Sequence, residues 1–263
     1  MARIYTLVNQ KGGVGKTTTA INLGAYLGYY GQRALLVDLD PQANATSSLG
    51  IDKRSVRVGT YEVLIGSTTI APQIMHNPRF KLSLLPSSPA LAGAEVELIE
   101  VEKREHRLAD ALTAINDRYD YILIDCPPSL SLLTVNGLLA ARSGVIIPVQ
   151  CEYLALEGLG QLTQTISRVR SSLMPDLQVR GVVLTMFDSR TRLAADVVGE
   201  VRKYFPEQVF EAVIPRSIRL AEAPSYGLPI STYAPESHAA QAYAALAREI
   251  LIQDGVPVAQ PQE

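Results

Sequence analysis

Seven short apolar segments divide the chain, and each has the length and composition of a β-strand. Several are apolar nearly throughout, as in residues 34–37 (ALLV) and 121–124 (YILI). Uninterrupted apolar strands are typical of a mainly parallel sheet that is buried on both faces. The predicted strands cover residues 3–8, 33–38, 81–85, 120–125, 144–149, 179–186 and 209–214.

Helical patterns lie between most of these strands. A helix is expected over residues 17–29, and apolar residues recur at spacings of three, four and seven in two later segments. This alternation predicts an α/β fold, a doubly wound and mostly parallel sheet with helices on both faces. The two later apolar faces consist of Leu98, Val101, Leu108, Leu112 and Ile115 in a long charged helix, and of Leu156, Leu159, Leu162, Ile166, Val169 and Leu173 before Pro175.

The sequence predicts a single domain over residues 1–254. No linker rich in Gly, Pro or Ser divides its 263 residues, and no internal repeat is visible. Residues 86–93 (PSSPALAG) are expected to form a loop that enters the long charged helix. Residues 255–263 contain two prolines and little to bury, so we expect a frayed, disordered tail there.

Composition and charge narrow the class of protein. With 47% hydrophobic and 19% charged residues the chain is neither disordered nor fibrous, and its net charge of −2 means that any DNA binding must come from a local patch. Two cysteines, Cys126 and Cys151, are too few for a disulfide framework or a four-thiolate metal site. No apolar run approaches the length of a membrane span, and the N-terminus lacks a signal-peptide core, so a cytoplasmic protein is expected.

Residues 10–18 (QKGGVGKTT) lie directly between the first predicted strand and the first predicted helix. Glycines let a backbone turn tightly and point its N–H groups at phosphate oxygens, and the helix N-terminus adds partial positive charge. Lys16 is placed to reach the β and γ phosphates of ATP, and the Thr17 hydroxyl to ligate Mg²⁺. Gln10 occupies the place of a glycine in the strict pattern, so the loop is a variant. The predicted nucleotide contacts in this loop are Lys11, Gly12, Gly13, Val14, Gly15, Lys16, Thr17 and Thr18.

Three aspartates end two of the predicted strands. Asp38 and Asp40 close the second strand, and Asp125 closes the strand at residues 120–125. Ligands of open α/β sheets bind at the carboxyl ends of strands, so these side chains are expected near the phosphate loop. Asp125 has the Walker B arrangement and is predicted to hold Mg²⁺ through water, with Asp38 supporting the hydration shell. Cys126 is expected to be a small packed side chain.

The sequence resembles the ParA/Soj group of partitioning ATPases over residues 2–253. Lys-Gly-Gly-Val-Gly-Lys-Thr-Thr at residues 11–18 is similar to the deviant Walker A signature. Two departures are Ser217, where asparagine is common, and Tyr226, where histidine is expected. The matching stretches are Asn9–Thr19, Val37–Thr46, Asp120–Leu130, Pro148–Gly158 and Ile214–Gly227.

The resemblance implies roles for individual residues. Lys11 would reach across a nucleotide-sandwich homodimer to the partner's phosphates and neutralise charge that develops during cleavage. Asp40 would position the attacking water. Pro215 would border the adenine, and Met186 would contact it as well.

It also implies DNA segregation as the function. ATP-bound dimers would coat DNA non-specifically at the nucleoid, and a ParB-type centromere-binding protein would trigger hydrolysis and release. Arg190 and Arg219 fall where the DNA-contacting arginines of the family lie. Between Ile166 and Arg219 there are nine Lys/Arg and six Asp/Glu, a local charge of +3 in a chain of −2.

Four other functions stay open at this point. A membrane-associated ATPase of the MinD type would need a basic amphipathic C-terminal helix, whereas residues 252–263 are neutral to acidic and interrupted by Pro257. An iron–sulfur carrier or reductase would need two exposed cysteines in each subunit. A metabolic ligase would need an acceptor-substrate motif, and none is visible. Nucleotide binding without hydrolysis is disfavoured by Asp40 together with Lys11 and Lys16.

Overall fold

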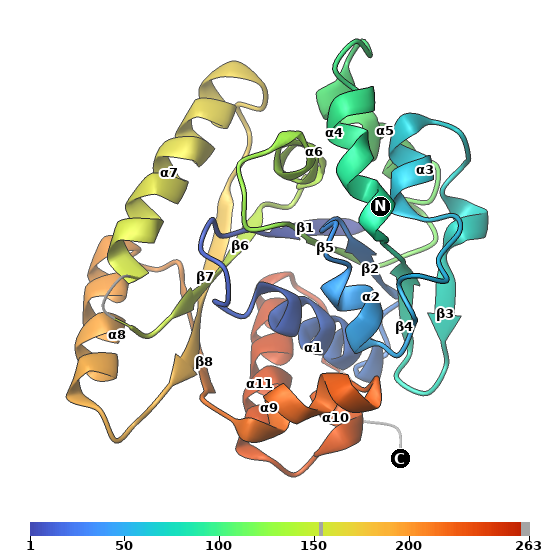
Figure 1. The fold of residues 1–263 in the computed structure, drawn as a ribbon. Helices are drawn as coiled ribbons and strands as arrows, with labels where there is room; N and C mark the ends of the chain where they lie inside the picture. Colours follow the sequence, from blue (N-terminus) through green and yellow to red (C-terminus); the bar gives the residue numbers. More distant parts are fainter. Residues whose placement is uncertain (153–154, 259–263) are drawn as a thin grey trace.

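The computed structural model describes residues 1–152 and 155–258, leaving out the side chains of residues 155–157. Within these residues one eight-stranded sheet has the order β3-β4-β2-β5-β1-β6-β7-β8 (Figure 1). All neighbouring strands are parallel except β3 and β4. The strands are β1 (Arg3–Leu7), β2 (Ala34–Asp38), β3 (Met75–Asn77), β4 (Leu82–Leu85), β5 (Tyr121–Asp125), β6 (Val145–Gln150), β7 (Val179–Phe187) and β8 (Val209–Pro215).

The predicted doubly wound α/β sheet is confirmed, and each of the seven predicted strands is present. The sequence missed β3, an antiparallel strand of three residues (MHN) at the edge of the sheet. Met75 and His76 are exposed, so this strand lacks the apolar pattern by which buried strands are recognised.

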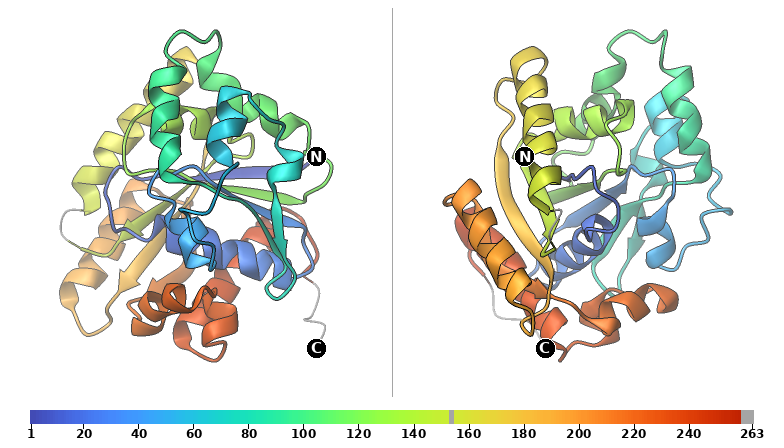
Figure 2. Two further views of the ribbon diagram at one scale, coloured as in Figure 1. Left: turned by 45° about the vertical axis from the view of Figure 1, so that its right-hand side comes forward. Right: turned by 60° about the vertical axis from the view of Figure 1, so that its left-hand side comes forward.

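Helices cover both faces of the sheet (Figures 1 and 2). On one face α1 and α11 pack together against β1, β2, β5 and β8, and on the other α3, α5, α6, α7 and α8 bury a second layer of apolar side chains. The helices are α1 (Lys16–Tyr29), α2 (Asn44–Ser48), α3 (Thr60–Ile65), α4 (Ala94–Glu97), α5 (Arg107–Thr113), α6 (Leu132–Ala140), α7 (Ala155–Ser172), α8 (Arg192–Tyr204), α9 (Ile218–Glu222), α10 (Ile230–Tyr233) and α11 (His238–Gln253), with 3₁₀ turns η1 (Ala71–Gln73), η2 (Pro89–Gly93), η3 (Arg104–His106) and η4 (Ala223–Tyr226).

The expected long charged helix over residues 98–115 is wrong. The chain instead forms α4, η3 and α5, and Lys103 between them has a φ of 54°, which interrupts a right-handed helix. Leu98, Leu108, Leu112 and Ile115 are nevertheless fully buried in one cluster, and Val101 packs against it. The apolar spacing therefore identified core residues correctly, although the backbone that carries them is broken. The predicted loop at residues 86–93 contains the turn η2.

The second predicted apolar face belongs to α7. Leu159, Leu162, Ile166 and Val169 are buried against β6 and β7, as expected. Leu173, one residue beyond the helix, is 44% exposed and does not belong to that face. The side chain of Leu156 lies outside the described residues.

The end of α11 is tied to the amino edge of the sheet. The carboxylate of Asp254 accepts hydrogen bonds from the hydroxyls of Tyr5 and Tyr121 at 2.8–2.9 Å and forms an ion pair with Arg180 at 3.0 Å. Desolvation raises the pKa of Tyr5 to about 12, so its hydroxyl stays a donor. Beyond Asp254, Val256 and Val258 still pack against the core, and residues 259–263 lie outside the described part of the chain, where the frayed tail stays a prediction.

Two glycine-to-alanine changes test the packing of α1. A Cβ at Gly28 would overlap the carbonyl oxygen of Lys81, which leads into β4, whereas a Cβ at Gly199 in α8 would meet nothing within 4 Å. Alanine favours a helix over glycine by about 1 kcal/mol, so Gly199→Ala should raise the melting temperature by a few degrees. Gly28→Ala should lower it despite the same gain in propensity, and equal melting temperatures for the two variants would contradict this packing.

Candidate functional site

The loop between β1 and α1 is shaped by two of its three glycines. Gly13 and Gly15 have φ values of 74° and 87°, which L-residues with side chains rarely adopt. Gly12 is not left-handed, and a Cβ there would meet nothing within 4 Å. The fold of this chain therefore requires Gly13 and Gly15, whereas Gly12 faces open space.

Hydrogen bonds to β6 and from β7 hold this loop in place. The Asn9 amide donates to the carbonyl of Pro148 in β6 at 2.8 Å, and its oxygen accepts the N–H of Lys11 at 3.0 Å. The hydroxyl of Thr185 in β7 donates to the carbonyl of Val14 at 2.8 Å. Sequence reasoning assigned no role to Asn9 or Thr185, because both act through pairs far apart in the chain.

Lys16 begins α1 and lies beneath the loop. Its ammonium donates to the carbonyl of Lys11 at 3.1 Å, and the residue is only 6% exposed. Desolvation lowers its pKa, and the nearby carboxylate of Asp125 counteracts this shift. The cation is thus held close to the carbonyl and carboxylate groups of the site.

Asp38 and Asp125 lie side by side at the ends of β2 and β5. Both are fully buried. One oxygen of Asp38 accepts the N–H and the hydroxyl of Thr46 at 2.8 and 2.6 Å, and the other accepts the N–H of Asp40 at 3.2 Å. Desolvation raises the pKa of Asp38 to about 6. Because its oxygens are engaged by its own chain, Asp38 fixes the segment that carries Asp40.

Asp125 has no such partners. Among the described residues, neither of its buried oxygens forms a hydrogen bond of ordinary geometry, although the nearby Thr17 hydroxyl favours the charged form. Desolvation, followed by repulsion from Asp38, raises its pKa to about 8. A buried carboxylate without partners is costly, and a cation removes that cost. The residues therefore fit a divalent cation between Thr17 and Asp125.

The phosphate loop and Asp40 line one cavity of about 380 Å³. Asp40 is 5% exposed, and its carboxylate accepts the N–H of Gln42 at 2.8 Å. The other lining residues come from the loop, the start of α1, the segments after β2 and β5, and the end of β7: Gly12, Gly13, Gly15, Lys16, Thr17, Thr18, Gln42, Asn44, Ser48, Pro128 and Met186. Lys16 and Thr17 at the start of α1 and Asp40 after β2 thus line one cavity, as the sequence predicts.

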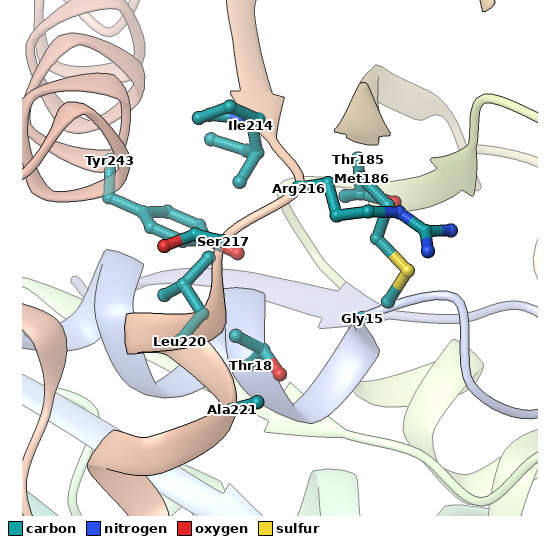
Figure 3. A pocket seen from close by; sticks show the side chains of 11 residues that line it. Gly15, Thr18, Thr185, Met186, Ile214, Arg216, Ser217, Leu220, Ala221 and Tyr243 are labelled. Carbon is teal, nitrogen blue, oxygen red and sulfur yellow. The ribbon is translucent and has the colours of Figure 1, made fainter. Parts of the chain in front are cut away.

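A second cavity of about 300 Å³ shares Gly15, Thr18 and Met186 with the first (Figure 3). Its walls are mainly apolar and come from β7, β8, α9 and α11. Met186 has a φ of 52°, an unusual backbone for its residue type. The other lining residues are Thr185, Ile214, Pro215, Arg216, Ser217, Leu220, Ala221 and Tyr243. The sequence suggested Met186 and Pro215 and missed Leu220 and Tyr243, because only tertiary packing brings α9 and α11 here.

Arg190 and Arg219 lie at the same edge of the sheet as these cavities. Arg190 follows β7 and Arg219 belongs to α9 after β8, and the Arg216 N–H donates to the Phe187 carbonyl at 2.9 Å, which joins the two segments. Arg180, which the sequence grouped with them, lies at the opposite edge with Asp254. The nine basic residues of that segment therefore do not form one continuous face.

The two cysteines are both free and buried. Burial raises the pKa of the Cys126 thiol strongly and that of Cys151 to about 11. No group of three His, Cys, Asp or Glu side chains suited to a metal ion occurs among the described residues. An iron–sulfur cluster bridging two subunits needs exposed thiolates, which neither cysteine offers.

Comparisons with known proteins show the family to which the chain belongs. Residues 2–179 match the family model described as an AAA domain. The sporulation initiation inhibitor protein Soj of Bacillus subtilis is 52% identical over 250 residues, which cover 95% of this chain and 98% of the relative. The chain belongs to the ParA/Soj family of chromosome-partitioning proteins.

One further relative supports the family, and one solved structure supports the fold. The chromosome partitioning protein ParA of Myxococcus xanthus is 52% identical, covering 97% of this chain and 89% of the relative. A crystal structure from Mycobacterium smegmatis, described as cobyrinic acid a,c-diamide synthase with bound ADP and magnesium, is 39% identical. It has a TM-score of 0.85 and covers 99% of this ParA/Soj chain and 100% of its own. Among the described helices, none has the length and apolar character needed to cross a bilayer.

The unpartnered carboxylate of Asp125 predicts a specific pH dependence of stability. Its pKa of about 8 in the folded chain exceeds the value of about 4 expected in the unfolded chain. The folded state therefore holds this proton more tightly, and its stability falls as pH rises from about 4 to about 8. Asp125→Asn should raise the melting temperature of the nucleotide-free chain by about 2–4 °C or more at about pH 8. The increase should be smaller at about pH 5.

Differential scanning fluorimetry at both pH values measures this effect. Asp110→Asn, an exposed position on α5, is the matched control and should shift the melting temperature little at either pH. An Asp125→Asn variant that is less stable than the parent chain at about pH 8 would contradict the electrostatic reading of this site.

Proposed function

We propose that this chain is an ATP-dependent DNA-partitioning ATPase. An ATP-bound pair of chains binds DNA non-specifically at the nucleoid in the cytoplasm, and a ParB-type centromere-binding protein stimulates hydrolysis. The observation that carries the proposal is the buried carboxylate of Asp125, which lies near Lys16 of the glycine loop and has no hydrogen-bond partner of ordinary geometry among the described residues. Membership of the ParA/Soj family supports the same function.

The nucleotide occupies the two adjoining cavities in this proposal. The loop amides of Gly12, Gly13, Val14 and Gly15, with those of Thr17 and Thr18 in the first turn of α1, surround the phosphates, and the Lys16 ammonium contacts the β and γ phosphates. The apolar cavity near Met186 and Pro215 accommodates the adenine ring. The related Mycobacterium smegmatis structure, which is described with bound ADP and magnesium, supports a nucleotide as the ligand of this chain.

Mg²⁺ would be held by the Thr17 hydroxyl and, through water, by Asp125. When bound, the ion supplies positive charge that stabilises the phosphate oxygens. Asp38 supports this region indirectly, because its hydrogen bonds to Thr46 and Asp40 fix the segment after β2.

Asp40 positions the attacking water in this account. Its carboxylate lines the phosphate cavity and is oriented by the Gln42 N–H at 2.8 Å. An oriented carboxylate at this place lowers the entropy cost of aligning water with the γ phosphate. Lys16 and, from the partner chain, Lys11 stabilise the charge that develops.

The same loop supports the proposal of a homodimer. Among the described residues, the Lys11 ammonium makes no hydrogen bond or ion pair, although its backbone is fixed by Asn9 and Lys16. Gly12 faces open space, so a second loop can approach it closely. We infer that two chains meet here with nucleotide between them, each supplying Lys11 to the other.

A contrast between two variants tests the nucleotide site. Lys16→Ala should abolish ATP binding, because it removes the cation held against the phosphates. Asp40→Ala should keep ATP binding and slow hydrolysis by about a hundredfold or more, so that the ATP-loaded dimer accumulates. Nucleotide affinity, turnover and light scattering on the same samples measure these effects, and a monomeric Asp40→Ala variant with normal turnover would refute the role of Asp40.

DNA binding is tested by charge reversal at the carboxyl edge. Contacts to phosphates make the affinity nearly independent of sequence and strongly dependent on salt. Arg190→Glu and Arg219→Glu should each weaken binding of a labelled duplex in fluorescence anisotropy by about tenfold or more. ATP-dependent dimerisation, followed by sedimentation, should persist. Unchanged DNA affinity in both variants would place the DNA-binding surface elsewhere.

A further inference from the structure

Arg190 is engaged by an acidic residue of its own chain. Its Nε and Nη2 atoms donate to the two carboxylate oxygens of Asp188 at 2.8 and 2.7 Å. This two-point geometry uses the same guanidinium edge that binds a phosphate in two-point fashion. The Arg190 side chain is 84% exposed, so solvent and ligands can reach the pair.

The Asp188 carboxylate is fixed independently of that ion pair. The N–H of Arg190 donates to it at 3.1 Å, and the carbonyl of Asp188 accepts the N–H and the hydroxyl of Thr191 at 3.1 and 3.0 Å. Hydrogen bonds from Arg190 lower the pKa of Asp188 to about 2, so it stays ionised at neutral pH. A preorganised carboxylate thus faces the arginine at the turn after β7.

Arg219 on the neighbouring segment is also paired with an acidic residue of its own chain, through a single hydrogen bond. Its Nη1 atom donates to the Oε2 atom of Glu222 at 3.0 Å, one helical turn along α9. The hydroxyl of Tyr233 donates to the same oxygen at 3.0 Å, and the ring of Tyr226 stacks on Tyr233 at 5.0 Å between centroids. Tyr233 from α10, with Tyr226 from η4 stacked on its ring, therefore orients the acidic partner of Arg219.

We propose that Asp188 and Glu222 compete with DNA phosphate for Arg190 and Arg219 and so set how tightly a chain can hold DNA. This inference rests on the proposed function, because it concerns the affinity of the same surface. Each pair has no net charge, so the two arginines of one chain add no net positive charge to this edge. Exposed ion pairs are weak, so the closely spaced phosphates of a duplex can displace the carboxylates.

The competition has a consequence for the dimer. A single chain offers two arginines, each of which must exchange a carboxylate for a phosphate, and its affinity is correspondingly low. Two chains joined by nucleotide offer four arginines, and the second pair binds at a high effective concentration. Because the contributions of the two chains multiply, the acidic partners lower the DNA affinity of the dimer by a larger factor than that of a single chain.

Removing the carboxylates should therefore strengthen DNA binding. Asp188→Asn and Glu222→Gln should each raise the affinity of the ATP-loaded protein for a labelled duplex by about two- to fivefold for each chain that uses the arginine. The salt dependence should steepen by up to about one released counterion per arginine. Tyr233→Phe, which keeps Glu222 but removes the hydrogen bond that orients it, should give a smaller gain than Glu222→Gln.

Two controls separate local competition from a general change in charge. Asp196→Asn removes the same charge at an exposed position of α8, where no ion pair is present among the described residues, and should have a much smaller effect. The gain from Asp188→Asn should vanish in an Arg190→Ala background, because the carboxylate then has no arginine to occupy. Sedimentation of each variant with ATP shows whether dimerisation has changed.

The outcomes distinguish this inference from the function on which it rests. If Asp188→Asn and Asp196→Asn raise the affinity equally, or the gain survives in the Arg190→Ala background, the competition is refuted while the DNA surface stands. If Arg190→Ala and Arg219→Ala both leave DNA affinity unchanged, or no DNA is bound with ATP, the proposed surface fails and this inference fails with it.

Discussion

The carboxylate of Asp125 is the constraint on which the rest of the site depends. It closes β5 beside Asp38, is fully buried, and has no hydrogen-bond partner of ordinary geometry among the described residues. An isolated buried charge destabilises a fold, so the surrounding chain must provide compensation or leave room for a cation. The positive charge of Lys16 compensates part of the buried negative charge, and the cavity lined by Thr17 leaves room for a cation that would compensate the rest.

Asp38 and Asp125 differ in their hydrogen bonding. This difference explains how one edge of the sheet contains both a fixed segment and a carboxylate that can bind a cation. Thr46 and the backbone of Asp40 occupy the oxygens of Asp38, which fixes the segment after β2. Asn9 and Thr185 fix the loop after β1 by bonds to Pro148 and Val14. Among the described residues, the carboxylate of Asp125 and the ammonium of Lys11 are left without hydrogen-bond partners of ordinary geometry, and both belong to this edge of the sheet.

Much of this arrangement was predictable because it depends on local patterns. Apolar strands ended by aspartate, and a glycine loop between a strand and a helix, place Lys16, Asp40 and Asp125 at one sheet edge by topology alone. The remaining features depend on contacts distant in sequence. Tyr243 reaches the apolar cavity from α11, and Lys103 breaks an expected helix while Leu98 and Leu108 keep their buried positions. The edge strand β3 is too short and too exposed to show the apolar pattern of a buried strand.

In the function proposed above, a second chain completes the site, with Lys11 acting on the nucleotide of its partner. A mixing experiment tests it directly, with Lys11→Ala and Asp40→Ala chains assayed for ATP hydrolysis alone and together. In a mixed dimer the Asp40→Ala chain supplies Lys11 to a site whose Asp40 is intact. Random pairing makes half of the dimers mixed, each with one competent site, so the mixture should recover about a quarter of the parent turnover. A mixture no more active than its separate components would contradict the account.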